Sequence, residues 1–364
     1  MIKRFPLPDL LKGFAVFLIV PVHILETFID YPGRESLFGK ILLVLGGPVA
    51  VPIFMMIMGY FVALSKKGTL QNIFRGGLIF MIGILLNIGL NFHLLLKIKF
   101  GGLRFDPLQA IFGVDIFYLA GLSIIILALL KTIKTGRQWI VLSLILFVSV
   151  TTSYFNEILM VTDRNYLLPF IGGGYSWSYF PLFPWLTYPL VGFLFQEKES
   201  WIREFLERNK TATIAFLLAV LVPVVFFHQF GFEVAIDLPQ YYHHEFWFIL
   251  WTLGVDILWV SMAWFVVHQF NEFPAFVFLR WLGSNITVFY IVQWLIIGNI
   301  ATAIYQTQDL SRFGYWFGTI FLATIGITFL FGKVKTLHNK NIYINDLLKS
   351  KLGLLQHRHQ YPAK

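Results

Sequence analysis

The sequence predicts an all-α, polytopic membrane protein of about ten transmembrane helices with both termini in the cytoplasm. Hydrophobic residues make up 57% of the 364 residues and charged residues 13%, whereas soluble domains carry about a quarter charged residues. The mean hydropathy is +0.73. A soluble chain of this size cannot bury so much apolar surface, so the composition excludes a cytosolic enzyme, a nucleic-acid-binding protein and a disordered chain. The absence of Cys also excludes thiol catalysis, disulfides and Cys-ligated metal.

The transmembrane helices are predicted from apolar runs along the chain. A helix needs about 20 apolar residues to cross the bilayer core. The runs that approach this length are 10–29, 41–64, 73–96, 108–130, 138–155, 177–196, 211–230, 247–269, 281–304 and 313–332. The run at 177–196 is the least regular because three Pro residues interrupt it.

The two ends of the chain complete the predicted organisation. His23 and Glu26 interrupt the first run and no small-residue cleavage site follows it, which indicates a retained helix and not a signal peptide. After residue 332 the chain is basic and carries apolar residues at helical spacing, a pattern typical of an interfacial helix. We therefore expect one membrane domain over 1–332 and a basic cytoplasmic tail over 333–364.

The formal net charge of +9 is mainly a topology signal. When the predicted spans alternate across the membrane, 21 of the 28 Lys and Arg residues fall on the side of the N-terminus. Cytoplasmic loops carry the excess of Lys and Arg in membrane proteins. This distribution places both termini in the cytoplasm.

Polar residues on the first helix form a stripe along one face. At 100° per residue, Lys12 and His23 lie about 20° apart around the axis and about 16 Å apart along it, and Asp9, Glu26 and Asp30 fall within about 60° of His23. Ionisable groups at bilayer depth are costly and often functional. Two interpretations stay open: a working site, or an interfacial Asp9–Lys12 pair with a separate buried His23–Glu26 pair.

Two acidic residues also lie within later apolar runs. Asp115 and Asp256 have no basic neighbour nearby in the sequence, so each needs a partner on another helix or a shifted pKa. Either residue pairs with Lys12 or a His, or marks a pathway through the membrane.

Other polar residues favour structural roles. Asn87 and Asn91 are one helical turn apart, and such residues more often join helices than bind ligands. The adjacent His243 and His244 are of a type that can ligate metal, but no carboxylate stands at ligand spacing beside them. We therefore expect solvated loop histidines at these two positions.

Five segments carry a resemblance to a known family. They are PDLLKGFAV at 8–16 followed by His23, PIF at 52–54, DPLQAIFG at 106–113, YFPLFPWL at 179–186 and WLGSNITVFY at 281–290 followed by Gln293. In this order they resemble motifs of the transmembrane acyltransferases that include heparan-α-glucosaminide N-acetyltransferase and its bacterial relatives. The related acyltransferase 3 family has an Arg eleven residues before a His on its first helix, and here these positions hold Lys12 and His23.

The resemblance implies an acyltransferase whose donor is acyl-CoA, with acetyl-CoA as the expected co-substrate, at the cytoplasmic side. It implies a glycan or glycolipid amine or hydroxyl as acceptor on the far side, and no metal. His23 would act as general base or carry the acyl group itself, with Glu26 or Asp30 orienting its imidazole. The cationic residues expected to hold the CoA phosphates are Lys12, Arg4, Lys66, Lys67, Arg75 and Arg280. The residues expected to contact substrate are Asn285, Gln293, Asp115, Asp256 and Trp185.

We expect an integral, multi-pass protein of a bacterial cytoplasmic membrane, surrounded by membrane lipids. Related enzymes suggest a homodimer. Lys at position 12 supplies a point charge in place of the bidentate fork of Arg. Two alternatives to acyl transfer therefore stay open. One is a proton-coupled transporter or flippase using Asp115, Asp256 and His23, and the other is a non-catalytic relative of the family.

Overall fold

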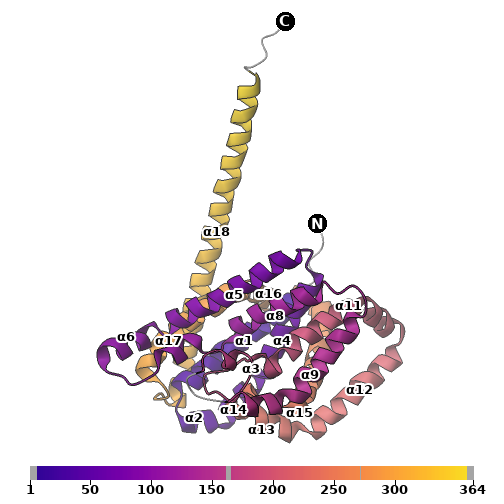
Figure 1. Ribbon diagram of the computed structural model, residues 1–364, viewed down its shortest axis with the longest axis vertical. Coiled ribbons are helices and arrows are strands. Elements are labelled where there is room, and N and C mark those ends of the chain that lie inside the picture. The colour runs from indigo at the N-terminus through magenta and orange to yellow at the C-terminus, as the bar shows by residue number, and fades with distance from the viewer. Residues whose placement is uncertain (1–5, 161–164, 271, 359–364) are drawn as a thin grey trace.

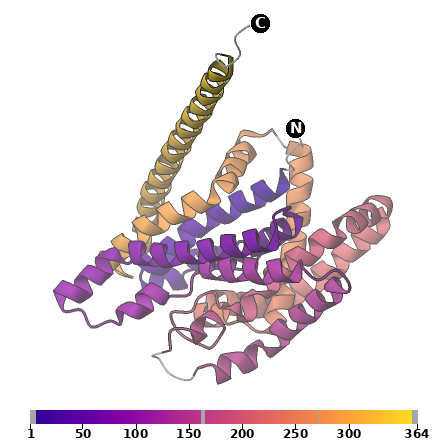
Figure 2. The ribbon, with the colours of Figure 1, turned by 45° about the horizontal axis from the view of Figure 1, so that its top comes forward.

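The computed structural model describes residues 6–160, 165–270 and 272–358 as a bundle of helices (Figures 1 and 2). Within these ranges no β-strand occurs, and only two isolated bridges join Ile29 to Gln308 and Val114 to Ser178. The helices are α1 (Leu7–Phe28), α2 (Tyr31–Glu35), α3 (Leu37–Gly46), α4 (Val51–Leu64), α5 (Thr69–Leu90), α6 (Phe92–Gly101), α7 (Pro107–Phe112), α8 (Ile116–Leu130), α9 (Arg137–Ile158), η1 (Leu168–Phe170), α10 (Leu182–Trp185), α11 (Thr187–Arg208), α12 (Lys210–Phe226), α13 (His228–Ile236), α14 (Leu238–Tyr242), α15 (Phe246–Phe270), α16 (Pro274–Ser284), α17 (Ile286–Ile304), η2 (Leu310–Arg312) and α18 (Phe313–Arg358).

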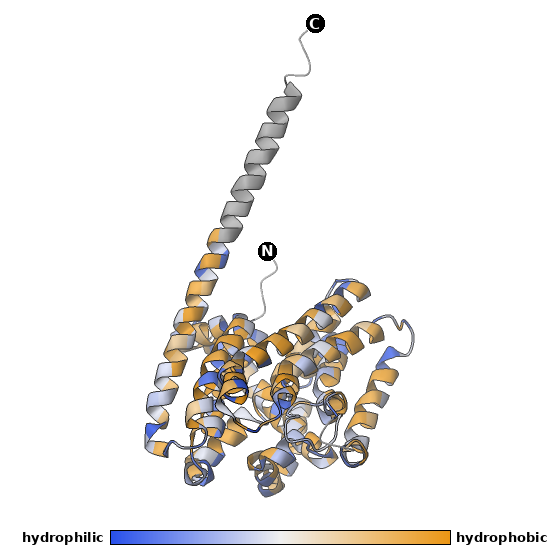
Figure 3. Ribbon diagram, turned by 60° about the vertical axis from the view of Figure 1, so that its left-hand side comes forward, coloured by the Kyte–Doolittle hydropathy of each residue, from blue (hydrophilic) through white to orange (hydrophobic). Residues whose placement is uncertain are grey.

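The protein is an all-α, integral, multi-pass membrane protein. Among the described residues, seven helices are long and apolar enough to cross a membrane, or eight if a bent pair counts as one span. The bent pair joins α11 to α12 at 119°, and α8 is apolar but has only 15 residues. Apolar residues run along most of the helices (Figure 3), and many of their large apolar side chains are exposed. Each predicted run overlaps a helix, and the count of ten spans stays a prediction.

Three helix pairs approach each other through glycines. A Cβ atom added to Gly13 of α1 would lie 1.9 Å from the carbonyl oxygen of Leu279, and one added to Gly283 of α16 would lie 1.9 Å from that of Asp9. The same reciprocal contact joins α4 to α11 and α5 to α8, the latter pair lying side by side in Figures 1 and 2. Helices in lipid gain association energy from such close backbone packing, so these three contacts hold the bundle together.

Two segments differ from the sequence-based expectation. The predicted run at 177–196 becomes an irregular loop up to Pro181, and α11 begins only at Thr187 and continues to Arg208. Proline is well tolerated in the first turn of a helix, and α11 begins at Thr187 with Pro189 in its first turn. At the other end of the chain, α18 passes the predicted domain boundary at 332 without a break and projects from the bundle (Figure 1). The expected interfacial helix is thus a direct extension of the last apolar helix.

Candidate functional site

His23 faces α17 and contacts its amide residue. The Nδ1 atom of His23 is 3.2 Å from Oε1 and 3.0 Å from Nε2 of Gln293, so the amide can accept a proton from the imidazole or donate one to it. Gln293 is buried and His23 half-buried. The Thr27 hydroxyl donates to the carbonyl oxygen of His23 over 2.5 Å. Gln293 therefore holds the orienting position that we expected for Glu26 or Asp30.

Two aromatic residues beside Gln293 also contact His23. Tyr290, Gln293 and Trp294 lie at i, i+3 and i+4 on α17, which places them on one face of the helix. The Trp294 ring lies 4.0 Å from the His23 ring between centroids, and the Tyr290 ring lies 6.1 Å away at 78°. The sequence analysis did not assign Tyr290 or Trp294 to the site. Their helical spacing from Gln293 is the signal that identifies them.

Asp115 joins the same group of residues through a phenol. It is the N-cap of α8, where its Oδ1 atom accepts from the backbone N–H of Ile116 over 2.6 Å. The Tyr290 hydroxyl donates to its two carboxyl oxygens at 2.8 and 3.0 Å. The partner that Asp115 required from another helix is thus a phenol and not a base.

Glu26 lies one turn beyond His23 and contacts a different partner. The Tyr242 hydroxyl donates to Glu26 Oε2 over 3.4 Å, and Trp185 donates from Nε1 to the carbonyl oxygen of Tyr242 over 2.8 Å. Burial raises the pKa of Tyr242 well above its usual range, and the Glu26 carboxylate raises it further, so Tyr242 is a neutral donor. Trp185 is fully buried and supports the site through Tyr242.

The end of α1 is fixed by backbone contacts and caps. Asp30 accepts from the backbone N–H of Gly33 over 3.0 Å and thereby caps α2. The Gln306 side chain donates to the Glu26 carbonyl oxygen over 3.1 Å and accepts from Arg34 over 3.2 Å. The structure thus places Asp30 in a capping role, away from the His23 imidazole.

Lys12 lies near the opposite end of α1. Its ammonium group is 2.8 Å from Asp9 and 5.6 Å from the centroid of the Phe61 ring on α4. The Lys12 side chain is only 13% exposed, so an ion pair orients this charge before any ligand binds. Arg280 lies on the adjacent helix α16, next to Leu279, whose backbone contacts Gly13.

The other predicted donor-binding cations are distributed differently. Lys66 and Lys67 are exposed in the turn between α4 and α5, and Arg75 is exposed on α5. No hydrogen bond or ion pair within the described ranges joins their side chains to Lys12. Arg4 lies outside the described residues.

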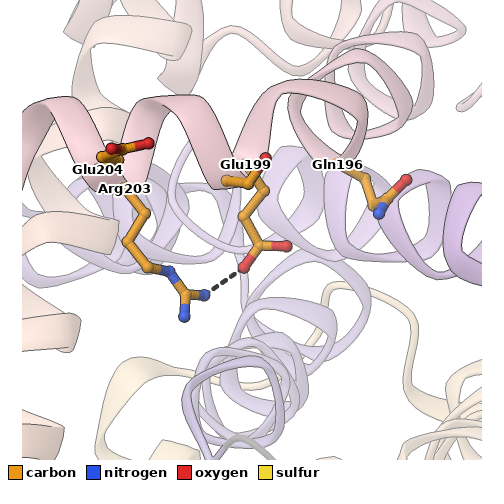
Figure 4. Close-up of a pocket in the computed structure, with 5 residues that line it drawn as sticks. Gln196, Glu199, Arg203 and Glu204 are labelled. Atoms are coloured by element: carbon orange, nitrogen blue, oxygen red, sulfur yellow. Dashed lines mark hydrogen bonds and ion pairs between the residues drawn. The ribbon is translucent and has the colours of Figure 1, made fainter.

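A pocket of about 410 Å³ lies along the C-terminal half of α11. Its lining residues are Gln196, Glu199, Ser200, Arg203 and Glu204 (Figure 4). Arg203 forms an ion pair with Glu199, and the Tyr60 hydroxyl of α4 donates to Glu199 over 2.6 Å. The lining carries more carboxylates than cations, so it does not fit a polyphosphate.

The remaining predicted residues lie apart from His23. Asn285 is at the start of α17 and donates to the carbonyl oxygen of Trp281 over 2.9 Å. It precedes Gln293 by eight residues, about 12 Å of helix rise. Asp256 is 1% exposed on α15, and neither of its carboxyl oxygens has a hydrogen-bond partner.

The expectation of solvated loop histidines is wrong. His244 is 2% exposed and His243 is half-buried. The Tyr188 hydroxyl is 2.8 Å from His244 Nε2, and burial lowers the pKa of His244 to about 3. His244 packs against the rings of Trp185, Tyr188, Tyr241 and Phe248, and these contacts between helices could not be predicted from the sequence alone.

The two asparagines of α5 have the structural role that we expected. Asn87 donates to the carbonyl oxygens of Ile111 and Gly113 at 3.0 and 2.7 Å, and Asn91 donates to that of Ala110 at 3.0 Å. They hold the segment that precedes Asp115 against α5.

The chemistry available around His23 is proton transfer. An imidazole with a hydrogen-bonded Nδ1 leaves Nε2 free to exchange a proton. Among the residues that the structure describes, no three His, Asp or Glu side chains converge as a metal site. The Lys12 cation and the His23 base lie on the same helix, with the Asp115–Tyr290 pair beside the base.

Comparison with known proteins gives one match. Residues 6–332 match the family model described as the acyltransferase domain of the acyltransferase 3 type. No curated protein and no solved structure matches the chain. The match agrees with the second of the two resemblances, while the resemblance to heparan-α-glucosaminide N-acetyltransferase is not confirmed.

Proposed function

The chain belongs to the acyltransferase 3 family, and from this premise we propose that it is a membrane acyltransferase that uses acyl-CoA, with acetyl-CoA as the main donor. The acceptor is an amine or hydroxyl of an extracytoplasmic or lipid-linked sugar. The observation that carries the proposal is the contact of His23 with Gln293. His23 lies on α1, the helix that also carries Lys12.

His23 acts as the general base of the proposed reaction. When Gln293 Oε1 accepts from Nδ1–H, the neutral imidazole presents Nε2 as the proton acceptor. Nε2 removes the proton from the acceptor amine or hydroxyl as its nitrogen or oxygen attacks the thioester carbonyl carbon. The carbon–sulfur bond then breaks, and the CoA thiolate takes the proton from His23. The Trp294 ring at 4.0 Å stabilises the transient imidazolium, because a cation is attracted to an aromatic face.

Lys12 binds the donor at the cytoplasmic mouth. Eleven residues separate it from His23, about 16 Å along the helix, so the phosphates of CoA and the reacting thioester are held at different depths. The Asp9 ion pair fixes the Lys12 ammonium group, which compensates in part for the missing guanidinium fork. Arg4, Arg280, Lys66, Lys67 and Arg75 supply further positive charge at the same mouth.

The acceptor approaches from the opposite end of α1. Glu26 and Tyr242 lie there with Trp185 behind them, and Asp115 lies beside Tyr290. Carboxyl and phenol groups suit a ligand rich in hydroxyl or amino groups. Gln293 contacts the reacting group, while Asn285 and Asp256 lie along the path at other depths. We further propose, from the family resemblance alone, a homodimer in a bacterial cytoplasmic membrane with the acceptor outside.

Release of free CoA thiol tests the proposal. Purified protein in nanodiscs is given radiolabelled acetyl-CoA with amino-sugar or lipid-linked sugar acceptors, and thiol release and labelled acceptor are measured. We expect His23→Ala to reduce turnover by about 10²- to 10⁴-fold, the usual contribution of a general base. Lys12→Gln should raise KM for acetyl-CoA with a smaller effect on kcat, and Lys12→Arg should retain binding.

The matched controls are an exposed histidine and an exposed lysine. His228→Ala on α13 and Lys134→Gln between α8 and α9 separate loss of the site from a general effect of the substitution. Wild-type protein that neither binds nor consumes acetyl-CoA, together with a His23→Ala variant that behaves as wild type, would refute the proposal. Accumulation of substrate in proteoliposomes without CoA would favour the transporter alternative.

A further inference from the structure

Four buried oxygen atoms without hydrogen-bond partners lie between α14 and α15. They are the two carboxyl oxygens of Asp256, the hydroxyl of Thr252 and the hydroxyl of Tyr241. These residues are 1%, 0% and 4% exposed, respectively. Thr252 and Asp256 are one helical turn apart, so their side chains share a face of α15. Such groups are rare in native proteins, and each requires a water, an ion or another partner.

The hydroxyl oxygen of Tyr188 is a fifth candidate, because its proton is already donated to His244. The Nδ1 atom of His244 is 2.6 Å from the carbonyl oxygen of Tyr241, and because a carbonyl only accepts, Nδ1 carries the imidazole proton. Nε2 therefore accepts, and the Tyr188 hydroxyl, 2.8 Å away, donates to it. The lowered pKa of His244 agrees with this neutral tautomer. The Tyr188 oxygen is left with lone pairs only.

Several contacts place these oxygens near one another. The His244 ring lies 5.8 Å from the Tyr188 ring and 6.2 Å from the Tyr241 ring between centroids, and 5.0 Å from the ring of Phe248, which precedes Thr252 by one helical turn. Burial raises the pKa of Tyr241, and the nearby Tyr188, Glu26 and Asp256 raise it further. Asp256 and Tyr241 are therefore within electrostatic reach of each other.

Two indole donors near the cluster are already used. Trp185 donates from Nε1 to the carbonyl oxygen of Tyr242, and Trp251 donates to that of Val224. Within the described part of the chain Asp256 has no ion pair and accepts no hydrogen bond. An isolated buried carboxylate is far too costly to persist uncompensated. The cluster therefore requires either a cation beside Asp256 or a proton on its carboxyl group.

We propose that Asp256, Thr252, Tyr241 and Tyr188 form a binding site for a monovalent hard cation, Na⁺. All donors are oxygens, which hard cations prefer over nitrogen and sulfur. One carboxylate supplies one negative charge, which matches a single monovalent ion. Asp256 has no hydrogen bond to His23 or Gln293, and Na⁺ binding can be measured without acyl transfer.

The test measures Na⁺ binding and thermal stability of the purified full-length protein in detergent. Because a ligand that binds only the folded state stabilises it, we expect Tm to rise saturably with NaCl but not with choline chloride at equal ionic strength. Bound ²²Na⁺ should reach a single equivalent. Asp256→Asn should abolish both effects, and Thr252→Val should weaken Na⁺ affinity roughly tenfold, since each 1.4 kcal/mol is a factor of ten.

Glu245→Gln is the matched control, because this carboxylate is exposed and immediately precedes the same helix. It should bind Na⁺ as wild type does. Equal stability of wild type in NaCl and choline chloride, with no bound ²²Na⁺, would overturn the proposal even if Asp256→Asn does not fold. A stability that increases on acidification and ignores Na⁺ would also overturn it and would assign a proton to Asp256.

Discussion

The contact between α5 and α8 can be tested with two neighbouring glycines. A Cβ atom added to Gly76 would lie 2.7 Å from the carbonyl oxygen of Gly121 and 2.7 Å from the Ile125 side chain. A Cβ atom added to Gly77, the next residue of the same helix, would meet nothing within 4 Å. Gly76→Ala and Gly77→Ala thus make the same chemical change at neighbouring positions of one helix, about 100° apart around its axis.

The expected magnitude follows from two effects of opposite sign. Replacing Gly by Ala inside a helix stabilises the helix by roughly 0.5–1 kcal/mol, and this gain is common to both variants. Overpacking a close contact costs about 1–3 kcal/mol, and only Gly76→Ala meets one. We therefore expect Gly77→Ala to be neutral or stabilising and Gly76→Ala to be less stable than Gly77→Ala by about 1–3 kcal/mol.

Unfolding by SDS titration in mixed micelles measures the free energy of unfolding of both variants against wild type. Helix content by circular dichroism serves as the control, since both variants must retain it. Equal stability of the two variants, or a Gly76→Ala variant more stable than Gly77→Ala, would refute close backbone packing at this position.

Three further outcomes are expected from the region around His23 and from the buried loop. Gln293→Leu should lower kcat for thiol release by roughly 10- to 100-fold with little change in KM for acetyl-CoA, because it leaves Nδ1 of His23 unoriented and impairs the general base; an unchanged kcat would remove Gln293 from the mechanism. Tyr290→Phe deletes the phenol that donates to Asp115 and should cost about 1–3 kcal/mol of unfolding free energy, as measured by SDS titration. His244 has a folded pKa of about 3, so the unfolded chain binds the extra proton below its ordinary value of about 6.5, and wild-type stability should fall as the pH falls. Relative to His244→Gln, the loss between pH 6.5 and pH 5 should be about 1.6 kcal/mol, and parallel pH profiles of the two proteins would contradict it.

The helices were predictable from the sequence because lipid imposes a simple rule on composition. Runs such as 10–29, 138–155 and 247–269 coincide with α1, α9 and α15 within a few residues, since a spanning helix must be apolar along its length. The rule fails where the chain breaks inside the membrane domain. Hydropathy does not record the loop before α11, which contains Pro181, or the bend between α11 and α12, which lies at Asn209.

The site was predictable only in part, for a related reason. A helical projection places Lys12, His23 and Glu26 on one face of α1, and the structure finds polar partners for all three. The projection does not reveal which helix faces that stripe. We therefore expected Glu26 or Asp30, the acidic residues closest in sequence, to orient the His23 imidazole. In the structure the imidazole instead contacts Gln293, 270 positions away.

The packing of α1 explains how a membrane-deep base can be held at a fixed distance from a cation at the membrane surface. Near its start, the backbones of α1 and α16 meet at Gly13 and Gly283, which leaves no room for the helix to slide or turn. Near its end, the Thr27 carbonyl oxygen accepts from the backbone N–H of Gln306 over 2.9 Å. Because both ends of α1 are held, the axial distance between two of its side chains is set by their separation in the sequence, about 1.5 Å for each residue. The separation of Lys12 from His23 is therefore set by the covalent chain, and the mobile parts of the reaction are the donor and the acceptor.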